Sequence, residues 1–142
     1  RIGSSAASDV YKRQKYKSPK KNLISAGREY ISFGLKNSNT YDLMFGTAVP
    51  DFTKYPNLFI SANKTYLHLR TEVTAYSKDK DLSSIEEKCI DIWAKIHGLV
   101  GLLRKLQVVP KQLLEMPDTP IMPINAINND LDAYLEKFIK NM

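Results

Sequence analysis

The sequence predicts an all-α fold, an antiparallel helical bundle, because apolar residues recur at intervals of three and four along most of the chain. Ser, Asn, Gly and Pro, which favour helix starts and stops, stand at the ends of these periodic segments. No segment shows the strict apolar and polar alternation of a strand bounded by turn signals. Amphipathic helices bury their apolar faces against one another, which favours a bundle.

The first two expected helices cover residues 23–36 and 38–45. In NLISAGREYISFGLKN, one broad apolar face is formed by Leu23, Ala26, Tyr30 and Phe33, together with Ile24, Gly27, Ile31 and Leu35. The segment SNTYDLMFG then predicts a short helix, with Ser38 or Asn39 as its N-cap and Gly46 as its C-terminal stop.

Two longer helices follow a proline-marked loop, and we expect them near residues 57–77 and 84–107. The first is marked by apolar positions that step by three and four from Phe59 to Tyr76. The second is marked by a four-and-three stripe of Ile85, Cys89, Ile92, Ile96, Leu99, Leu103 and Leu106. Ser84 with Glu87, or Ser83 with Glu86, predicts a capping box at its start.

A proline-rich connection separates these helices from a final helix near residues 125–141. This helix would present Ile127, Leu131, Tyr134 and Phe138 on one face. A chain of 142 residues fits a single domain of ordinary size. We therefore assign residues 23–142 to one helical domain and residues 15–22 to a linker.

The positive charge lies in the first part of the chain. The net charge is +6, and the first 21 residues contain seven basic residues against one acidic residue. The remaining 14 basic and 14 acidic residues cancel, so the predicted domain has no charge pattern that favours nucleic acid. Residues 1–14, RIGSSAASDVYKRQ, resemble a translated sequencing adapter and are expected to be a non-native tail.

Cysteine content and hydropathy indicate the compartment. Cys89 is the single cysteine of the chain and has no partner for an intrachain disulfide. No apolar run is long enough to cross a bilayer, and no signal peptide is apparent. We therefore expect a cytoplasmic protein with no membrane partner.

The segment IWAKIHGLVGLL, residues 92–103, places unusual residues in an apolar helix. Gly98 and Gly101 each cost about 1 kcal/mol relative to alanine inside a helix, which indicates that they permit close packing. Trp93 and His97 are one turn apart and have ring nitrogens that need partners when they are buried.

Two motifs in this order resemble the C-terminal ligand-binding domain of tetracycline-repressor-type (TetR) transcriptional regulators. They are REYISFGLKNSNTYDLMFG, residues 28–46, and IWAKIHGLVGLL about fifty residues later. The most similar subgroup is the one named for its Trp-His-Gly (WHG) signature. The chain departs from the family at Ser38, where the family often has proline.

The resemblance implies a bacterial regulator in two parts. An N-terminal helix-turn-helix domain would bind operator DNA as a homodimer, and the helical domain would bind a small apolar or aromatic effector and form the dimer. Effector binding would shift the equilibrium between DNA-binding and released arrangements. The N-terminal part is expected upstream of Lys15, so operator DNA would be bound only through that missing domain and not by this fragment.

The candidate site residues follow from the helical faces and the resemblance. The ligand-pocket candidates are Phe33, Trp93, His97, Tyr30, Phe45 and Tyr66. The dimer-interface candidates are Ile96, Leu99, Leu103, Leu131, Tyr134 and Phe138. Each of these residues also fits a purely structural role in the core, because aromatic and aliphatic residues at helical spacing usually pack inside.

Catalysis is not expected, because no nucleophile elbow, phosphate-binding loop or dinucleotide fingerprint is present. His68, Cys89 and His97 match no standard zinc spacing, so we expect neither a metal nor a cofactor. The alternative function is a stand-alone helical protein-interaction module without a ligand.

Overall fold

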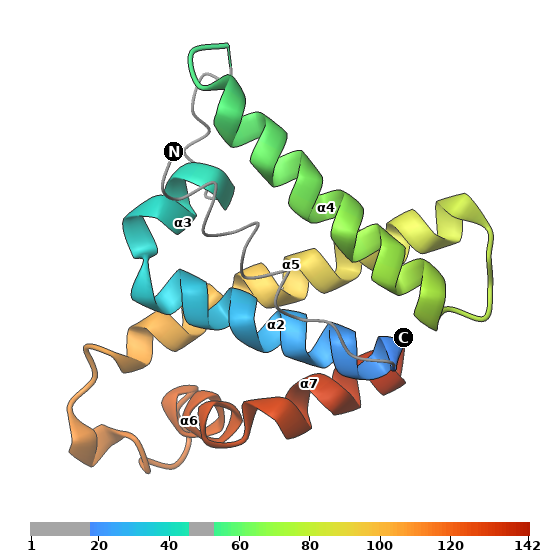
Figure 1. Cartoon of the computed structure of the whole chain (residues 1–142). Coiled ribbons are helices and arrows are strands. Elements are labelled where there is room, and N and C mark those ends of the chain that lie inside the picture. The colour runs from blue at the N-terminus through green and yellow to red at the C-terminus, as the bar shows by residue number, and fades with distance from the viewer. Residues whose placement is uncertain (1–17, 46–52) are drawn as a thin grey trace.

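The computed structural model describes residues 18–45 and 53–142, and it confirms the all-α prediction. The described residues contain six α-helices and one short 3₁₀ turn, and no strand. Figure 1 shows α2 at the centre of the helical bundle, with α3, α4, α5 and α7 around it. None of the described helices is both long and apolar enough to cross a lipid bilayer.

The helix bounds are close to those that periodicity predicts for the middle of the chain. In order, the elements are α2 (Pro19–Lys36), α3 (Ser38–Phe45), α4 (Pro56–Tyr76), α5 (Leu82–Leu106), the 3₁₀ turn η1 (Lys111–Leu113), α6 (Ile121–Asn129) and α7 (Leu131–Lys140). The predicted tail, residues 1–14, and Gly46 lie outside the described residues.

Helix α2 begins four residues before the predicted start at Leu23. The Ser18 side chain accepts a hydrogen bond from the backbone nitrogen of Lys21, and Pro19 occupies the first turn. Proline is favoured there because its missing N–H would have no helical partner. Part of the segment predicted as a linker, residues 15–22, is therefore helical.

Helix α5 does not start with the capping box that the sequence predicts. Its N-cap is Asp81, whose carboxylate accepts a hydrogen bond from the backbone nitrogen of Ser84 at 3.0 Å. The helix therefore begins at Leu82, two residues before the predicted start. An aspartate at this position satisfies an orphan N–H and complements the positive end of the helix dipole.

The predicted final helix at residues 125–141 is two helices. The chain leaves helical geometry at Asp130, with φ −144° and ψ 67°. The Asp130 carboxylate then accepts a hydrogen bond from the backbone nitrogen of Ala133, which caps α7. Asn and Asp side chains compete with helical hydrogen bonds, and Asn128, Asn129 and Asp130 stand together at this break.

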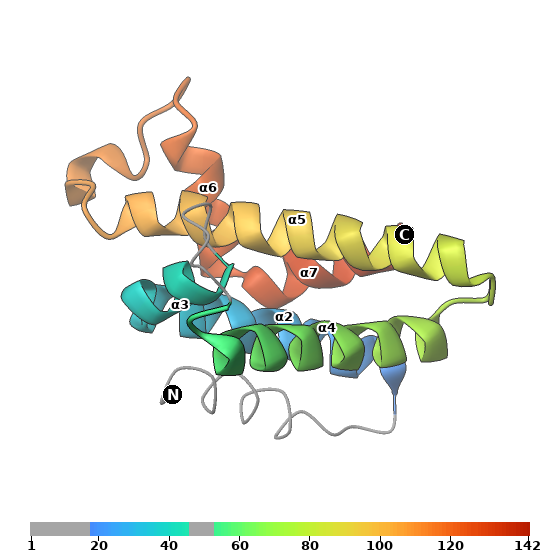
Figure 2. The ribbon, with the colours of Figure 1, turned by 90° about the horizontal axis from the view of Figure 1, so that it is seen from above.

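The core is formed by apolar side chains from α2, α3, α4, α5 and α7, with the longest buried stripe on α5. Figure 2, turned by 90°, shows α2 and α4 on one side of the bundle and α5 on the other. A buried polar contact joins α2 to α4, where the amide of Asn22 donates to the carboxylate of Glu72 at 3.0 Å. Close packing places Gly34 of α2 directly against Val100 of α5.

Candidate functional site

An apolar pocket lies between α2, α4, α5 and α7, with the end of α3 closing one side, and its volume is about 70 Å³. From α2 the lining residues are Leu23, Ala26, Gly27 and Tyr30, and from α3 Phe45. From α4 they are Ala62, Thr65, Tyr66 and Leu69. From α5 and α7 they are Ile92, Trp93, Ile96, Leu135, Phe138 and Ile139. The pocket thus draws on helices that are far apart in sequence.

One end of the pocket is aromatic. The ring centroids of Tyr30 and Phe45 are 5.1 Å apart, and Phe45 meets Trp93 edge to face at 6.1 Å. Trp93 also lies 6.3 Å from Tyr66. Edge-to-face and tilted pairs of this kind are favourable because the ring edge is positive and the ring face negative. A flat ring placed here would meet the same type of contact.

Among the described residues, those that line the pocket include no charged side chain. The lining residues that carry a polar side-chain atom are Tyr30, Thr65, Tyr66 and Trp93. The Thr65 hydroxyl donates to the backbone carbonyl of Ser61 at 3.0 Å, so its hydrogen is already used. The pocket therefore offers apolar contact with a few neutral hydrogen-bonding groups.

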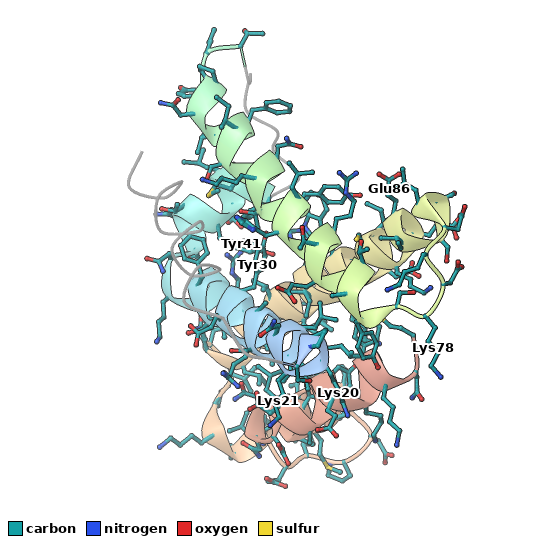
Figure 3. The ribbon with its side chains drawn as sticks, turned by 45° about the vertical axis from the view of Figure 1, so that its right-hand side comes forward. Lys20, Lys21, Tyr30, Tyr41, Lys78 and Glu86 are labelled. Atoms are coloured by element: carbon teal, nitrogen blue, oxygen red, sulfur yellow. The ribbon has the colours of Figure 1, made fainter. Side chains whose placement is uncertain are left out.

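The tyrosines stay uncharged at neutral pH. Burial, and then the neighbouring Tyr41, raise the pKa of Tyr30 well above the ordinary value of 10.0. Figure 3 shows Tyr30 and Tyr41 next to each other where α2, α3 and α4 meet. Burial, and then Cys89 and Glu86, also raise the pKa of Tyr66, and Arg70 opposes this shift. Both phenols remain proton donors.

Four of the six predicted pocket residues line this pocket: Tyr30, Phe45, Tyr66 and Trp93. Phe33 does not line it, because its side chain is buried on another part of α2, with its ring 6.5 Å from that of Tyr41. His97 does not line it either. Its Nδ1 is hydrogen-bonded to the Tyr41 hydroxyl at 2.7 Å, and the rings stack, which gives His97 a structural role.

The predicted dimer seam is largely occupied by contacts within the chain. Ile96, Leu99 and Leu103 are 5%, 5% and 2% exposed, so they point into the core and cannot reach a partner. Phe138 lines the pocket, and Leu131 and Tyr134 are partly buried against the core. The seam prediction is therefore wrong for the α5 residues, because this stripe is the chain's own core face.

Within the described part of the chain, no other helix packs closely against Gly98 or Gly101. A Cβ atom added at Gly98 or Gly101 would meet no atom within 4 Å, and both residues are exposed. The close approach occurs at Gly34, where an added Cβ would lie 2.8 Å from a Val100 methyl group. Glycine content alone does not tell which face of a helix is crowded.

The sequence reasoning missed the pocket residues of α7, Leu135 and Ile139, and the small residues of α2 and α4. The signal for α7 was present in its amphipathic pattern, but the pattern does not tell which helix lies opposite. Among the described residues, no three His, Cys, Asp or Glu side chains are grouped so that they could hold a metal ion.

The chain is matched by nothing at the level of family, sequence or structure: no family model, no curated protein and no solved structure matches it.

Proposed function

We propose that this chain is the effector-binding domain of a TetR-type transcriptional regulator, acting in the cytoplasm of a bacterium. The observation that carries the proposal is the pocket, which is lined by uncharged residues of five helices and has an aromatic end. The two motifs that resemble the family support it, since Tyr30, Phe45 and Trp93 come from them and line this pocket. Operator DNA would be bound by a helix-turn-helix domain upstream.

The ligand that fits is small and uncharged. A charged group inside the pocket would lose its hydration and find no ionic partner, which costs several kcal/mol or more. The volume of about 70 Å³ is below the roughly 150 Å³ of an engineered cavity that holds benzene. A single aromatic ring therefore requires some movement of the wall.

Helix α3 is the wall that such a movement would affect. It is short, and its Phe45 closes the aromatic end of the pocket. Its Tyr41 and Asp42 bind His97 and Arg104 of α5, so a shift of α3 would alter contacts across the bundle. In a regulator, a ligand that prefers the shifted arrangement would bias DNA binding by changing the populations of two states.

The test is thermal unfolding of the chain with toluene or phenol, and with benzoate as the charged counterpart. A ligand at one hundred times its Kd stabilises the folded state by about 2.7 kcal/mol. We expect toluene and phenol to raise Tm and to change the fluorescence of Trp93, while benzoate does neither.

A pocket-filling variant makes the test specific. Ala62→Leu places three more carbon atoms at the pocket wall, and we expect it to abolish the toluene effect without loss of folding. Ala75→Leu makes the same change on the exposed side of the same helix and should leave the effect intact. If no uncharged ring compound stabilises the parent chain, the effector proposal fails, and the alternative of a helical interaction module without a ligand stands.

A further inference from the structure

An open groove lies between α5 and α7, beside the apolar pocket, and its volume is about 590 Å³. Helix α7 packs mainly against α2, which leaves space between α7 and the first half of α5. Charged side chains line the groove: the ammonium groups of Lys88, Lys95 and Lys137, and the carboxylates of Glu87 and Asp91. The groove is therefore charged, whereas the pocket next to it is apolar.

The ring of Phe138 forms part of the wall between the two spaces. Among the described residues, Phe138 alone lines both the groove and the pocket. Lys95 lines only the groove, and its Nζ atom lies 4.6 Å from the centroid of the Phe138 ring and 5.5 Å from that of Tyr134. The negative face of an aromatic ring attracts a cation. The Lys95 ammonium group therefore helps to hold the Phe138 ring in the wall.

Lys95 is available to an anion. The ion pairs found among the described residues involve none of Lys88, Lys95 and Lys137. Lys88 donates instead to the neutral hydroxyl oxygens of Ser77 and Ser84, at 3.1 Å and 3.2 Å. A ligand carboxylate beside Lys95 would gain a charged hydrogen-bond donor at the mouth of the pocket. It would stay out of the apolar lining, and in an open groove it would keep part of its hydration.

The pocket extends from its aromatic end to Phe138. Phe45 of α3 and Tyr66 of α4 belong to the aromatic end, and Phe138 comes from α7. Figure 1 shows α3 and α4 on one side of α2 and α7 on the other. A ligand that reaches from the aromatic end to Lys95 therefore needs an uncharged tail joined to its charged group by a flexible chain. Benzoate has no such chain, since its carboxylate is attached directly to the ring.

We propose that the ligand site extends from the apolar pocket into the groove and takes an anionic amphiphile, with its apolar tail in the pocket and its carboxylate on Lys95. This proposal rests on the effector function above and specifies the class of ligand. The pocket itself still takes only an uncharged group, because the head group of the amphiphile lies outside it.

The contact between Lys95 and Phe138 also gives such a ligand a way in. A carboxylate is a stronger partner for Lys95 than an aromatic ring, because a full negative charge replaces the weaker field of the ring face. When Lys95 turns to the carboxylate, the Phe138 ring is released, and its rotation toward the groove opens and enlarges the pocket. An uncharged ligand does not offer this exchange, and a cationic head group would be repelled by Lys95.

Three ligands with the same tail test the charge of the head group: 4-phenylbutyrate, 4-phenylbutan-1-ol and 4-phenylbutylammonium. Isothermal titration calorimetry and the fluorescence of Trp93 measure their binding to the full chain at neutral pH. We expect the acid to bind at least about tenfold more tightly than the ammonium compound, which corresponds to about 1.4 kcal/mol. Added salt should weaken the binding of the acid and leave that of the alcohol unchanged, because salt screens the pairing of exposed charges.

Variants of α5 identify the residue that holds the head group. Lys95→Met removes the ammonium group and should weaken binding of the acid by about three- to tenfold. The alcohol should bind this variant at least as tightly as the parent chain, since Phe138 is no longer held, and its binding shows that the variant is folded. Asp91→Asn removes a carboxylate one helical turn from Lys95 and should strengthen binding of the acid. Lys105→Met, on α5 but outside the groove, is the matched control and should bind all three ligands like the parent chain.

Equal affinity of the parent chain and Lys95→Met for the acid would overturn the proposal, and so would equal binding of the acid and the ammonium compound. A parent chain that binds toluene but not 4-phenylbutyrate would overturn it as well, and would leave the effector proposal standing. A chain that binds neither toluene nor any of the three ligands would remove both.

Discussion

The side-chain hydroxyl of Tyr41 lies 2.7 Å from Nδ1 of His97, so a hydrogen bond between two stacked rings joins α3 to α5. The ring centroids are 5.6 Å apart and the planes are inclined by 16°. Tyr41 is 1% exposed, so its hydroxyl has no access to water as a substitute partner. This contact, rather than a bound ligand, accounts for the histidine in the apolar stretch of α5.

Tyr41→Phe should lower the free energy of unfolding by about 1–3 kcal/mol, because it removes the hydroxyl while the imidazole nitrogen loses its partner. Urea denaturation followed by circular dichroism measures the change, with an unchanged m-value expected. Tyr55→Phe is the control, since Tyr55 is 54% exposed. Equal stability of the two variants would show that the Tyr41 hydrogen bond contributes nothing.

Gly34→Ala and Gly101→Ala should change stability in opposite directions. At Gly34 the new Cβ would lie 2.8 Å and 3.1 Å from the two Val100 methyl groups, so α2 and α5 must separate, at a cost of about 1–3 kcal/mol. At Gly101 the new Cβ meets nothing within the chain, and alanine favours helix by up to about 1 kcal/mol. Thermal unfolding at low protein concentration compares the two, and a stabilised Gly34→Ala would contradict the close contact.

Loss of the Asp42 carboxylate should lower the stability of the fold less than loss of the Arg104 guanidinium. Its nitrogen atoms bind the Asp42 carboxylate at 2.8 Å and the backbone carbonyls of Gly34 and Ser38 at 3.1 Å and 3.3 Å. Asp42 is largely exposed, so Asp42→Asn should cost less than about 1 kcal/mol. Arg104→Lys cannot reproduce the fork and should cost about 1–3 kcal/mol. Chemical denaturation of both variants tests this order, which a smaller loss for Arg104→Lys would reverse.

The fold should lose stability in mild alkali through Cys89. Burial raises the pKa of this thiol from 9.0 to about 11, so the folded chain holds the proton more tightly than the unfolded chain. The associated stability is present below pH 9 and is lost as the pH rises toward about 11. Between pH 9 and 10 the loss should be about 1 kcal/mol.

Cys89→Ala should lose less stability than the parent chain between pH 9 and 10. The variant is less stable than the parent at neutral pH, because a buried side chain is shortened. The readout is the difference between the parent chain and Cys89→Ala in the slope of unfolding free energy against pH from pH 9 to 10, since the tyrosines that begin to ionise in this range are present in both. An identical slope in the parent and the variant would refute the contribution of Cys89.

Much of the local structure was predictable because it depends on neighbours in sequence. The bounds of α3 match the prediction, although Ser38 and Asn39, the predicted N-caps, both lie inside the helix, and the bounds of α4 and α5 differ from the prediction by one or two residues. The break at Asp130 was missed, since a periodic apolar pattern continues across it even though the side chain caps a new helix. The early start of α2 was missed because Ser18 and Pro19 lie within a lysine-rich run that looks like a linker.

The candidate site was predictable only in part. Periodicity places Tyr30 and Trp93 on apolar faces, and both line the pocket. The same periodicity does not tell that Tyr30 and Trp93 line the pocket while Phe33 and His97 do not, because it does not tell which helix packs against each edge of the face. The partner of His97 comes from α3, 56 residues earlier in the chain.

The sequence by itself determined the helical class, most of the helix positions and the apolar stripe of α5, since these follow from side-chain type and spacing within a few turns. Only the tertiary structure decided that Ile96, Leu99 and Leu103 fill the core, that Gly98 and Gly101 face outward, and that α7 completes the pocket. The physical reason is that a helix specifies its own faces locally, while the packing of distant segments specifies what each face contacts.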